Sequence, residues 1–212
     1  MSDTSATLRD RRSADAAAPP LEFWFELAST YSYPAALRVE AAARDAGVAI
    51  AWRPFLLGPI FAAQGWRDSP FNLYPAKGRY MWRDLERVCA RHNLPLRRPS
   101  QFPRDGLLAA RVALVGAERP WGPPFVRAVY HANFAQDIDI ADAGVLAPIL
   151  VRLGQDPDAV LDRANDPATK STLRRQTERA MALGIFGAPT FVSGDELFWG
   201  NDRLDDALAW HR

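Results

Sequence analysis

The fold of this chain is decided by residues 21–34, which read LEFWFELASTYSYP. The first part, residues 21–27, is short and rich in aromatic side chains, a pattern that predicts a β-strand. Residues 35–46 then place apolar side chains at helical spacing before Gly47, a typical residue after a helix C-terminus. Residues 48–54 predict a second strand. Because crossovers between neighbouring strands are right-handed, we expect the two strands to be parallel.

The rest of the chain divides into a helical middle and a β-rich end. Helical patterns occur in six segments between Pro75 and Leu183: 76–92, 104–117, 122–135, 142–153, 156–164 and 167–183. After them, residues 187–192 and 196–199 flank Ser-Gly-Asp and predict a hairpin. A short amphipathic helix over residues 203–210 is expected to follow, with Asn201 or Asp202 as its N-cap.

This order of elements predicts an α/β, thioredoxin-like fold with a large all-helical insertion after the second strand. We expect the thioredoxin-like domain to consist of residues 20–58 and 184–212, and the helical insertion domain to span residues 59–183. Residues 1–19 are rich in Ala, Asp and Arg, and they predict a disordered leader.

Composition excludes several classes of function. The chain has 212 residues, of which 48% are hydrophobic and 24% charged, and its net charge of +1 gives no indication of a nucleic-acid or membrane partner. It contains no run of 18 apolar residues that would predict a transmembrane helix. The first 20 residues lack the apolar region of a secretion signal, so we expect a cytoplasmic protein.

The cysteine and histidine content narrows the chemistry further. Cys89 is the one cysteine, which excludes an intramolecular disulfide and a dithiol redox cycle within the chain. Its apolar neighbours predict a buried structural thiol rather than a nucleophile. The histidines, His92, His131 and His211, lack metal-ligand spacing, so no metal site is expected.

Ser29 and Ser32 occupy the junction between the first strand and the first helix. A hydroxyl there lies at the positive end of the helix dipole, beside free first-turn N–H groups, and this position favours a phosphate, a carboxylate or a thiolate. The alternative is that one serine is simply an N-cap.

Two further patterns favour a binding site over a cap. The two serines have the spacing of a C-x-x-C redox motif, and Ala188-Pro189-Thr190 matches the segment in which a cis proline faces that motif. A cis Pro189 would leave the backbone of Ala188 free to pair with an extended, peptide-like ligand. The alternative for Pro189 is a trans proline that begins an edge strand.

With these pieces in place, the chain resembles the 2-hydroxychromene-2-carboxylate isomerase family, which is grouped with kappa-class glutathione transferases and DsbA-like proteins of the thioredoxin superfamily. The matching segments fall in order along residues 21–210: FELASTYSY at 25–33, KGRY at 77–80, FGAPT at 186–190 and WGNDRL at 199–204. The family usually has Asp in place of Glu26 and Pro in place of Thr30.

The resemblance implies a glutathione site. In the family, the serine that matches Ser29 holds the glutathione sulfur, and the residue that matches Ala188, before the cis Pro189, pairs with the cysteinyl backbone. An asparagine near Asn72 is also implicated. The γ-glutamyl end is bound by the segment that matches Trp199, Gly200, Asn201 and Asp202.

The resemblance also implies a reaction, the interconversion of 2-hydroxychromene-2-carboxylate and trans-o-hydroxybenzylidenepyruvate by reversible addition of the thiolate, and a homodimer. The alternatives are a kappa-like glutathione transferase and a non-catalytic binding protein. Lys77 or Arg53 could pair with the carboxylate of a small aromatic substrate, unless each is a solvated surface residue. The residues that could form apolar walls for the aryl ring, or could instead be plain core, are Tyr31, Tyr33, Phe55, Phe61 and Trp82. By the resemblance, Lys77 and Tyr80 lie on the helical face that covers the substrate.

Overall fold

The computed structural model describes residues 19–211, so the leader predicted for residues 1–19 lies, except for Pro19, outside the described residues. The chain begins with β1 (Leu21–Phe25), α1 (Ser32–Ala46) and β2 (Ile50–Pro54), and ends with β3 (Thr190–Ser193), β4 (Glu196–Trp199), the 3-10 turn η1 (Asn201–Arg203) and α10 (Leu204–Trp210). Between β2 and β3 lie α2 (Leu57–Ala63), α3 (Pro70–Leu73), α4 (Pro75–Arg91), α5 (Leu107–Gly116), α6 (Gly122–Phe134), α7 (Ala143–Arg152), α8 (Pro157–Asn165) and α9 (Pro167–Ala182).

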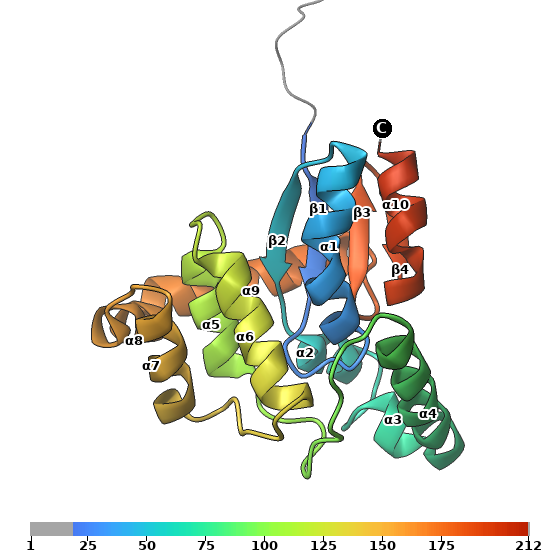
Figure 1. The fold of residues 1–212 in the computed structure, drawn as a ribbon, viewed down its shortest axis with the longest axis horizontal. Coiled ribbons are helices and arrows are strands. Elements are labelled where there is room, and N and C mark those ends of the chain that lie inside the picture. The colour runs from blue at the N-terminus through green and yellow to red at the C-terminus, as the bar shows by residue number, and fades with distance from the viewer. Residues whose placement is uncertain (1–18, 212) are drawn as a thin grey trace, which may run out of the picture.

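The four strands form one mixed sheet in the order β2-β1-β3-β4 (Figure 1). The expected parallel pairing of β1 with β2 is confirmed, and β3 runs antiparallel to both β1 and β4. Side chains of β1 alternate between the two faces of the sheet. Phe23 and Phe25 belong to the large core with α1, whereas Trp24 packs with Ala180 of α9. The α/β fold with a helical insertion is therefore as predicted.

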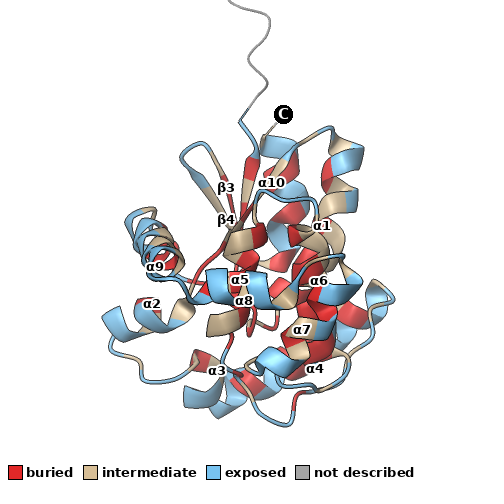
Figure 2. Ribbon diagram, turned by 90° about the vertical axis from the view of Figure 1, so that its left-hand side faces the viewer, coloured by how far each residue is buried: buried red, intermediate tan, exposed pale blue. Residues whose placement is uncertain are grey.

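The six predicted helices of the insertion are confirmed, with ends that shift by up to three residues. Figure 1 shows α5–α8 on one side of the sheet's lower end and α3 and α4 on the other. The short helices α2 and α3 were not predicted, because seven and four residues are too few to show helical periodicity. Figure 2 shows buried residues gathered at the sheet and along α6, whereas α2 is largely exposed.

Two smaller predictions have different outcomes. Cys89 is buried in α4, as expected, and burial raises the pKa of its thiol to about 11. The N-cap predicted for the last helix is wrong, because η1 precedes α10 and neither Asn201 nor Asp202 caps that helix with its side chain. Among the helices of residues 19–211, none has the length and apolar character needed to cross a membrane.

Candidate active site

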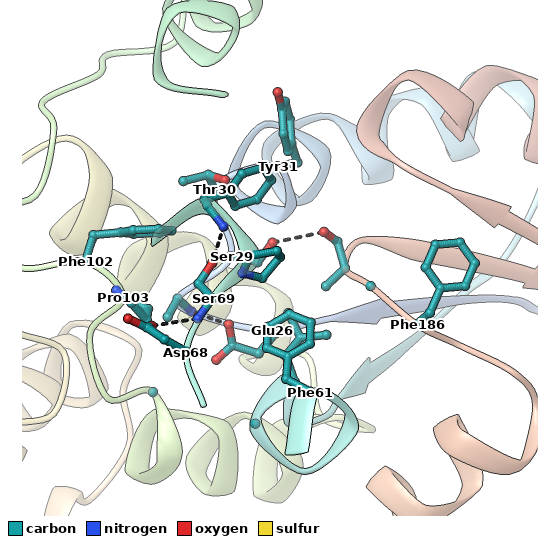
Figure 3. Close-up of a pocket in the computed structure, with 18 of the residues that line it drawn as sticks. Glu26, Ser29, Thr30, Tyr31, Phe61, Asp68, Ser69, Phe102, Pro103 and Phe186 are labelled. Carbon is teal, nitrogen blue, oxygen red and sulfur yellow. Dashed lines mark hydrogen bonds between the residues drawn. The ribbon is translucent and has the colours of Figure 1, made fainter. Parts of the chain in front are cut away.

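A cavity of about 1560 Å³ lies at the C-terminal end of β1. One wall comes from the β1–α1 loop, the loop before β3 and the segment after β4. The opposite wall comes from α2, α3 and α4, and residues 102–107 close one side. Figure 3 shows side chains from these segments converging on the same space. The cavity thus joins the sheet to the helical insertion.

Ser29 lies on the first wall, immediately before α1. Its Oγ donates a hydrogen bond to the Ala188 carbonyl at 3.0 Å (Figure 3). The same Oγ accepts one from the Ser32 N–H at 3.4 Å. Tyr31 occupies the N-cap position of α1, so neither serine does. Ser32 is fully buried and does not line the cavity. Ser29 therefore presents its hydroxyl to the cavity beside the first turn of α1.

The Ala188–Pro189 peptide bond is cis, which removes the alternative of a trans proline. Ala188 is partly exposed at the cavity, whereas Pro189 is buried beneath it and does not line it. In residues 19–211 we find no hydrogen-bond partner for the Ala188 N–H. The Ala188 N–H is therefore available as a backbone donor at the cavity, next to a carbonyl that Ser29 engages.

The segment after β4 is joined to the cis proline, since the Gly200 N–H donates to the Pro189 carbonyl at 2.9 Å. Gly200 has φ of +119°, a conformation that L side chains rarely adopt. Asn201 is buried, and its Oδ1 accepts a hydrogen bond from Arg38 at 3.2 Å. This bond leaves the Asn201 amide N–H groups as the available donors of that side chain.

Trp199 and Asp202 complete this segment. Trp199 is 51% exposed, and its ring centroid lies 4.8 Å from that of Phe186 in an edge-on arrangement. Gly187 lies beneath the indole, because a Cβ at that position would come within 2.4 Å of Trp199 Nε1. The exposed Asp202 carboxylate pairs with Arg203 at 3.1 Å.

Most sequence-predicted site residues converge on the cavity. Those that line it are Ser29, Tyr31, Lys77, Tyr80, Ala188, Trp199, Gly200, Asn201 and Asp202. Asn72 does not line it; its Nδ2 instead bridges Asp68, at 3.1 Å, and the Phe102 carbonyl, also at 3.1 Å. Asn72 thereby ties together two segments that line the cavity.

The structure corrects the substrate-contact predictions for Tyr33 and Arg53. Tyr33 is fully buried, and its hydroxyl donates to the Pro95 carbonyl, because the first turn of α1 directs it into the core. The Arg53 Nε lies 3.1 Å from Glu22 Oε1, since both residues project from neighbouring strands of the sheet. Neither residue lines the cavity. Phe55 and Trp82 do not line it either, because both are buried in the core, whereas Phe61 does.

Glu26 is the main cavity residue for which sequence reasoning assigned no role. Its Oε2 accepts a hydrogen bond from the Ala28 N–H at 3.0 Å. Desolvation by burial, opposed by this hydrogen bond, raises the pKa of the carboxyl to about 8. The available signal was a single acid at the end of an apolar strand, three residues before Ser29.

The second wall is apolar and aromatic. Phe61 of α2 lies 5.6 Å from Trp66, and Phe71 of α3 lies 6.3 Å from Tyr31, as measured between ring centroids. Lys77 of α4 adds a cation, with its Nζ 5.9 Å from the centre of the Phe71 ring. This wall can contact a flat apolar ligand that carries an anionic group.

Comparison with known proteins identifies relatives over almost the whole described chain. Residues 20–209 match the DsbA-like thioredoxin domain family. The chain is 32% identical to the 2-hydroxychromene-2-carboxylate isomerase of Sphingobium xenophagum over 87% of this chain and 94% of that protein. It is 27% identical to human glutathione S-transferase kappa 1 over 72% of this chain and 73% of that protein. A solved structure of 2-hydroxychromene-2-carboxylate isomerase superposes with a TM-score of 0.82 at 25% identity, covering 91% of this chain and 94% of that one.

Proposed function

Because the chain belongs to the DsbA-like thioredoxin family, alongside 2-hydroxychromene-2-carboxylate isomerases, we propose that it is a glutathione-dependent isomerase. Its reaction is the interconversion of 2-hydroxychromene-2-carboxylate and trans-o-hydroxybenzylidenepyruvate, or of a related aryl pyruvate, in aromatic catabolism. The observation that carries this proposal is Ser29, whose hydroxyl lies at a helix N-terminus beside the cis Pro189 loop. A redox cycle between two thiols of this chain is excluded, because its one cysteine, Cys89, is buried in α4.

The residues of the first wall fit glutathione. A thiol with a pKa of about 8.5 is mostly protonated at pH 7. Hydrogen bonding from Ser29 and the N-terminus of α1 both favour the thiolate, and a shift of about two units corresponds to about 2.7 kcal/mol. Ser29 now donates to the Ala188 carbonyl. In the complex Ser29 turns to the sulfur, and the Ala188 carbonyl and N–H pair with the cysteinyl backbone.

The segment after β4 supplies the γ-glutamyl site. The free amine and the carboxylate of the γ-glutamyl group have matching partners in this segment. Asp202 offers an exposed carboxylate, and Asn201 offers amide donors fixed by Arg38. The Trp199 indole covers Gly187 of the loop before β3, between the Ser29 site and the γ-glutamyl site. These contacts hold glutathione with its sulfur directed at Ser29.

The second wall supplies the aryl site. Tyr31, Phe61 and Phe71 contact the ring, while Lys77 pairs with the substrate carboxylate. When bound, glutathione supplies a thiolate that adds reversibly to the conjugated double bond, which allows rotation before the thiolate leaves. Tyr80, 64% exposed at the rim, limits access of water to this site.

A kappa-like glutathione transferase is the second candidate. It is favoured by the similarity to human glutathione S-transferase kappa 1 and by a cavity large enough for an adduct. A cytoplasmic location fits either enzyme, because a reduced glutathione pool is found in the cytosol. We propose a homodimer for either enzyme as well.

The experiment that tests the proposal is an isomerase assay with substoichiometric glutathione. We expect many turnovers of 2-hydroxychromene-2-carboxylate per glutathione, with no loss of free thiol. Stoichiometric consumption of the thiol would instead support the transferase, and glutathione binding without turnover would support a binding protein.

A further inference from the structure

Glu26 is held in place by its backbone, while its carboxyl faces the cavity. The Glu26 carbonyl accepts hydrogen bonds from the Ser29 N–H at 3.0 Å and from the Tyr130 hydroxyl at 2.8 Å. The side chain projects into the cavity from the end of β1, as Phe61 does from α2 (Figure 3). A ligand between the two walls would therefore contact this carboxyl.

Among residues 19–211, no cation forms an ion pair with Glu26. Arg104 lies on the closing loop, where it forms an ion pair with Asp137 and donates a hydrogen bond to Asn133. The other titratable or charged groups that line this part of the cavity or pack against it are Asp105 before α5, Tyr130 of α6, and Arg67 and Asp68 before α3. Asp105 lies close enough to disfavour a second negative charge, and the raised pKa of Glu26 leaves its carboxyl mostly neutral at pH 7.

Of the other four acids that line the cavity, one forms an ion pair and three accept hydrogen bonds. Asp84 accepts a hydrogen bond from the Tyr31 hydroxyl, Asp202 pairs with Arg203, and Asp68 accepts from Asn72. Asp105 accepts from the Leu107 N–H at the start of α5. Backbone groups hold the Glu26 carboxyl, with Oε2 accepting a hydrogen bond from the Ala28 N–H at 3.0 Å and the Ser29 N–H also nearby. No side chain of residues 19–211 forms a hydrogen bond or an ion pair with this carboxyl, so Oε1 can hold a proton toward a ligand.

We propose that Glu26 is the proton donor and acceptor that opens the chromene ring, a step that precedes double-bond isomerisation. This inference rests on the proposed function. The ring C–O bond of the hemiketal breaks, its electron pair moves to the phenolic oxygen, and that oxygen takes the proton of the neutral Glu26 carboxyl. The hemiketal hydroxyl returns a proton to the Glu26 carboxylate as the C=O bond forms. Glu26 ends as it began, and no net proton is consumed.

The test separates ring opening from isomerisation with two substrates and one variant. Glu26→Gln keeps the size and neutrality of the side chain and an acceptor for the Ala28 N–H, but it cannot transfer a proton. We expect this variant to lose about 100-fold in the rate of chromene ring opening, followed by stopped-flow absorbance without glutathione. With glutathione, it retains cis–trans isomerisation of o-methoxybenzylidenepyruvate, whose methylated phenol cannot form the ring.

The expected pH dependence has a definite sign. Because the neutral carboxyl is the donor, wild-type ring opening falls as pH rises through about 8, and Glu26→Gln lacks that fall. An infrared band of a protonated carboxyl, present in the wild type at pH 7 and absent in Glu26→Gln, reports the same group without reference to activity. Glu196→Gln, at an exposed position of β4, is the matched control and keeps all three signals of the wild type.

The outcomes distinguish this inference from the proposed function. If the wild type acts on both compounds and Glu26→Gln opens the ring within about tenfold of the wild-type rate, the role of Glu26 is overturned while the isomerase stands. Equal losses on both compounds also overturn it, because they indicate a general disturbance of the site. Inactivity of the wild type on both compounds overturns the proposed function itself. Glu26→Asp, which retains a transferable proton, is expected to keep part of the ring-opening activity.

Discussion

The two walls of the cavity are built in different ways. The first wall, with Ser29 and Ala188, consists of loops fixed by hydrogen bonds to the sheet and to α6, including those from Tyr130 to Glu26 and from Asn133 to Leu27. The second wall consists of short helices, in which α2 buries only Ile60 and α3 only Pro70. The first wall presents backbone groups and polar side chains beside the Phe186–Trp199 pair, whereas the second presents aromatic side chains and Lys77.

This difference assigns separate tasks to the two walls. Fixed polar groups recognise a ligand that is the same in every turnover, because their geometry needs no adjustment. Exposed aromatic side chains on short helices give apolar contact with less restriction of shape. We therefore expect substitutions on the first wall to affect glutathione and chemistry, and substitutions on the second wall to affect the aryl substrate alone.

The largest effect is expected from Ser29→Ala. Removing the hydroxyl removes the donor that stabilises the thiolate, and we expect kcat to fall by about 100-fold or more with measurable glutathione binding retained. Steady-state kinetics and titration calorimetry measure the two quantities. Ser32→Ala is the matched control, because the Ser32 hydroxyl is fully buried away from the cavity. Wild-type turnover in Ser29→Ala would refute the assigned role.

A smaller effect is expected from Phe61→Ala on the second wall. Loss of the ring removes about 1.5–3 kcal/mol of apolar contact, which corresponds to a rise of about tenfold or more in KM for the aryl substrate. Titration calorimetry should show an unchanged glutathione Kd. A weakened glutathione affinity would show that the two walls do not act separately.

Asp202→Ala tests the other end of the first wall. Loss of one charge-assisted contact with the γ-glutamyl amine is expected to weaken glutathione binding by about tenfold, because such bonds contribute about 1.5–3 kcal/mol and Asp202 is exposed. Asp195→Ala, in the exposed turn between β3 and β4, is the control. Equal Kd values for both variants by calorimetry would remove Asp202 from the site.

The last prediction concerns stability rather than activity. The pKa of Glu26 is raised from 4.5 to about 8 in the folded protein, so the folded state binds the proton more tightly than the unfolded chain. Its contribution to stability is complete below about pH 4.5 and is lost as pH rises to about 8. Denaturant unfolding should therefore show a component that declines over this range and is absent in Glu26→Gln. The same slope in both proteins would contradict the raised pKa.

The first wall could be predicted from sequence because its parts are local and ordered. Ser29 follows a strand and opens a helix, and the Ala-Pro-Thr segment precedes another strand, so the sheet topology alone brings them together. The second wall could be predicted only in part, through the helix that carries Lys77 and Tyr80. The helices α2 and α3 are too short to show a period, and their position depends on contacts that are distant in sequence.

Individual residues illustrate the same limit. Tyr33 and Arg53 have the residue types of a binding site, but α1 directs one into the core and β2 pairs the other with Glu22. Glu26 is the opposite case, because its position at the end of a strand suggests no role. Its raised pKa follows from burial, which the sequence does not reveal. Residue type thus predicted which residues of the first wall gather at the cavity, whereas tertiary contacts decide which charged groups line it.

A crystal structure of the protein with glutathione tests the central assignment most directly. We expect the sulfur to lie within hydrogen-bond distance of Ser29 Oγ, with the cysteinyl backbone paired to Ala188 and the γ-glutamyl end at Asn201 and Asp202. A glutathione molecule bound with its sulfur away from Ser29, or bound outside the cavity, would contradict the assignment.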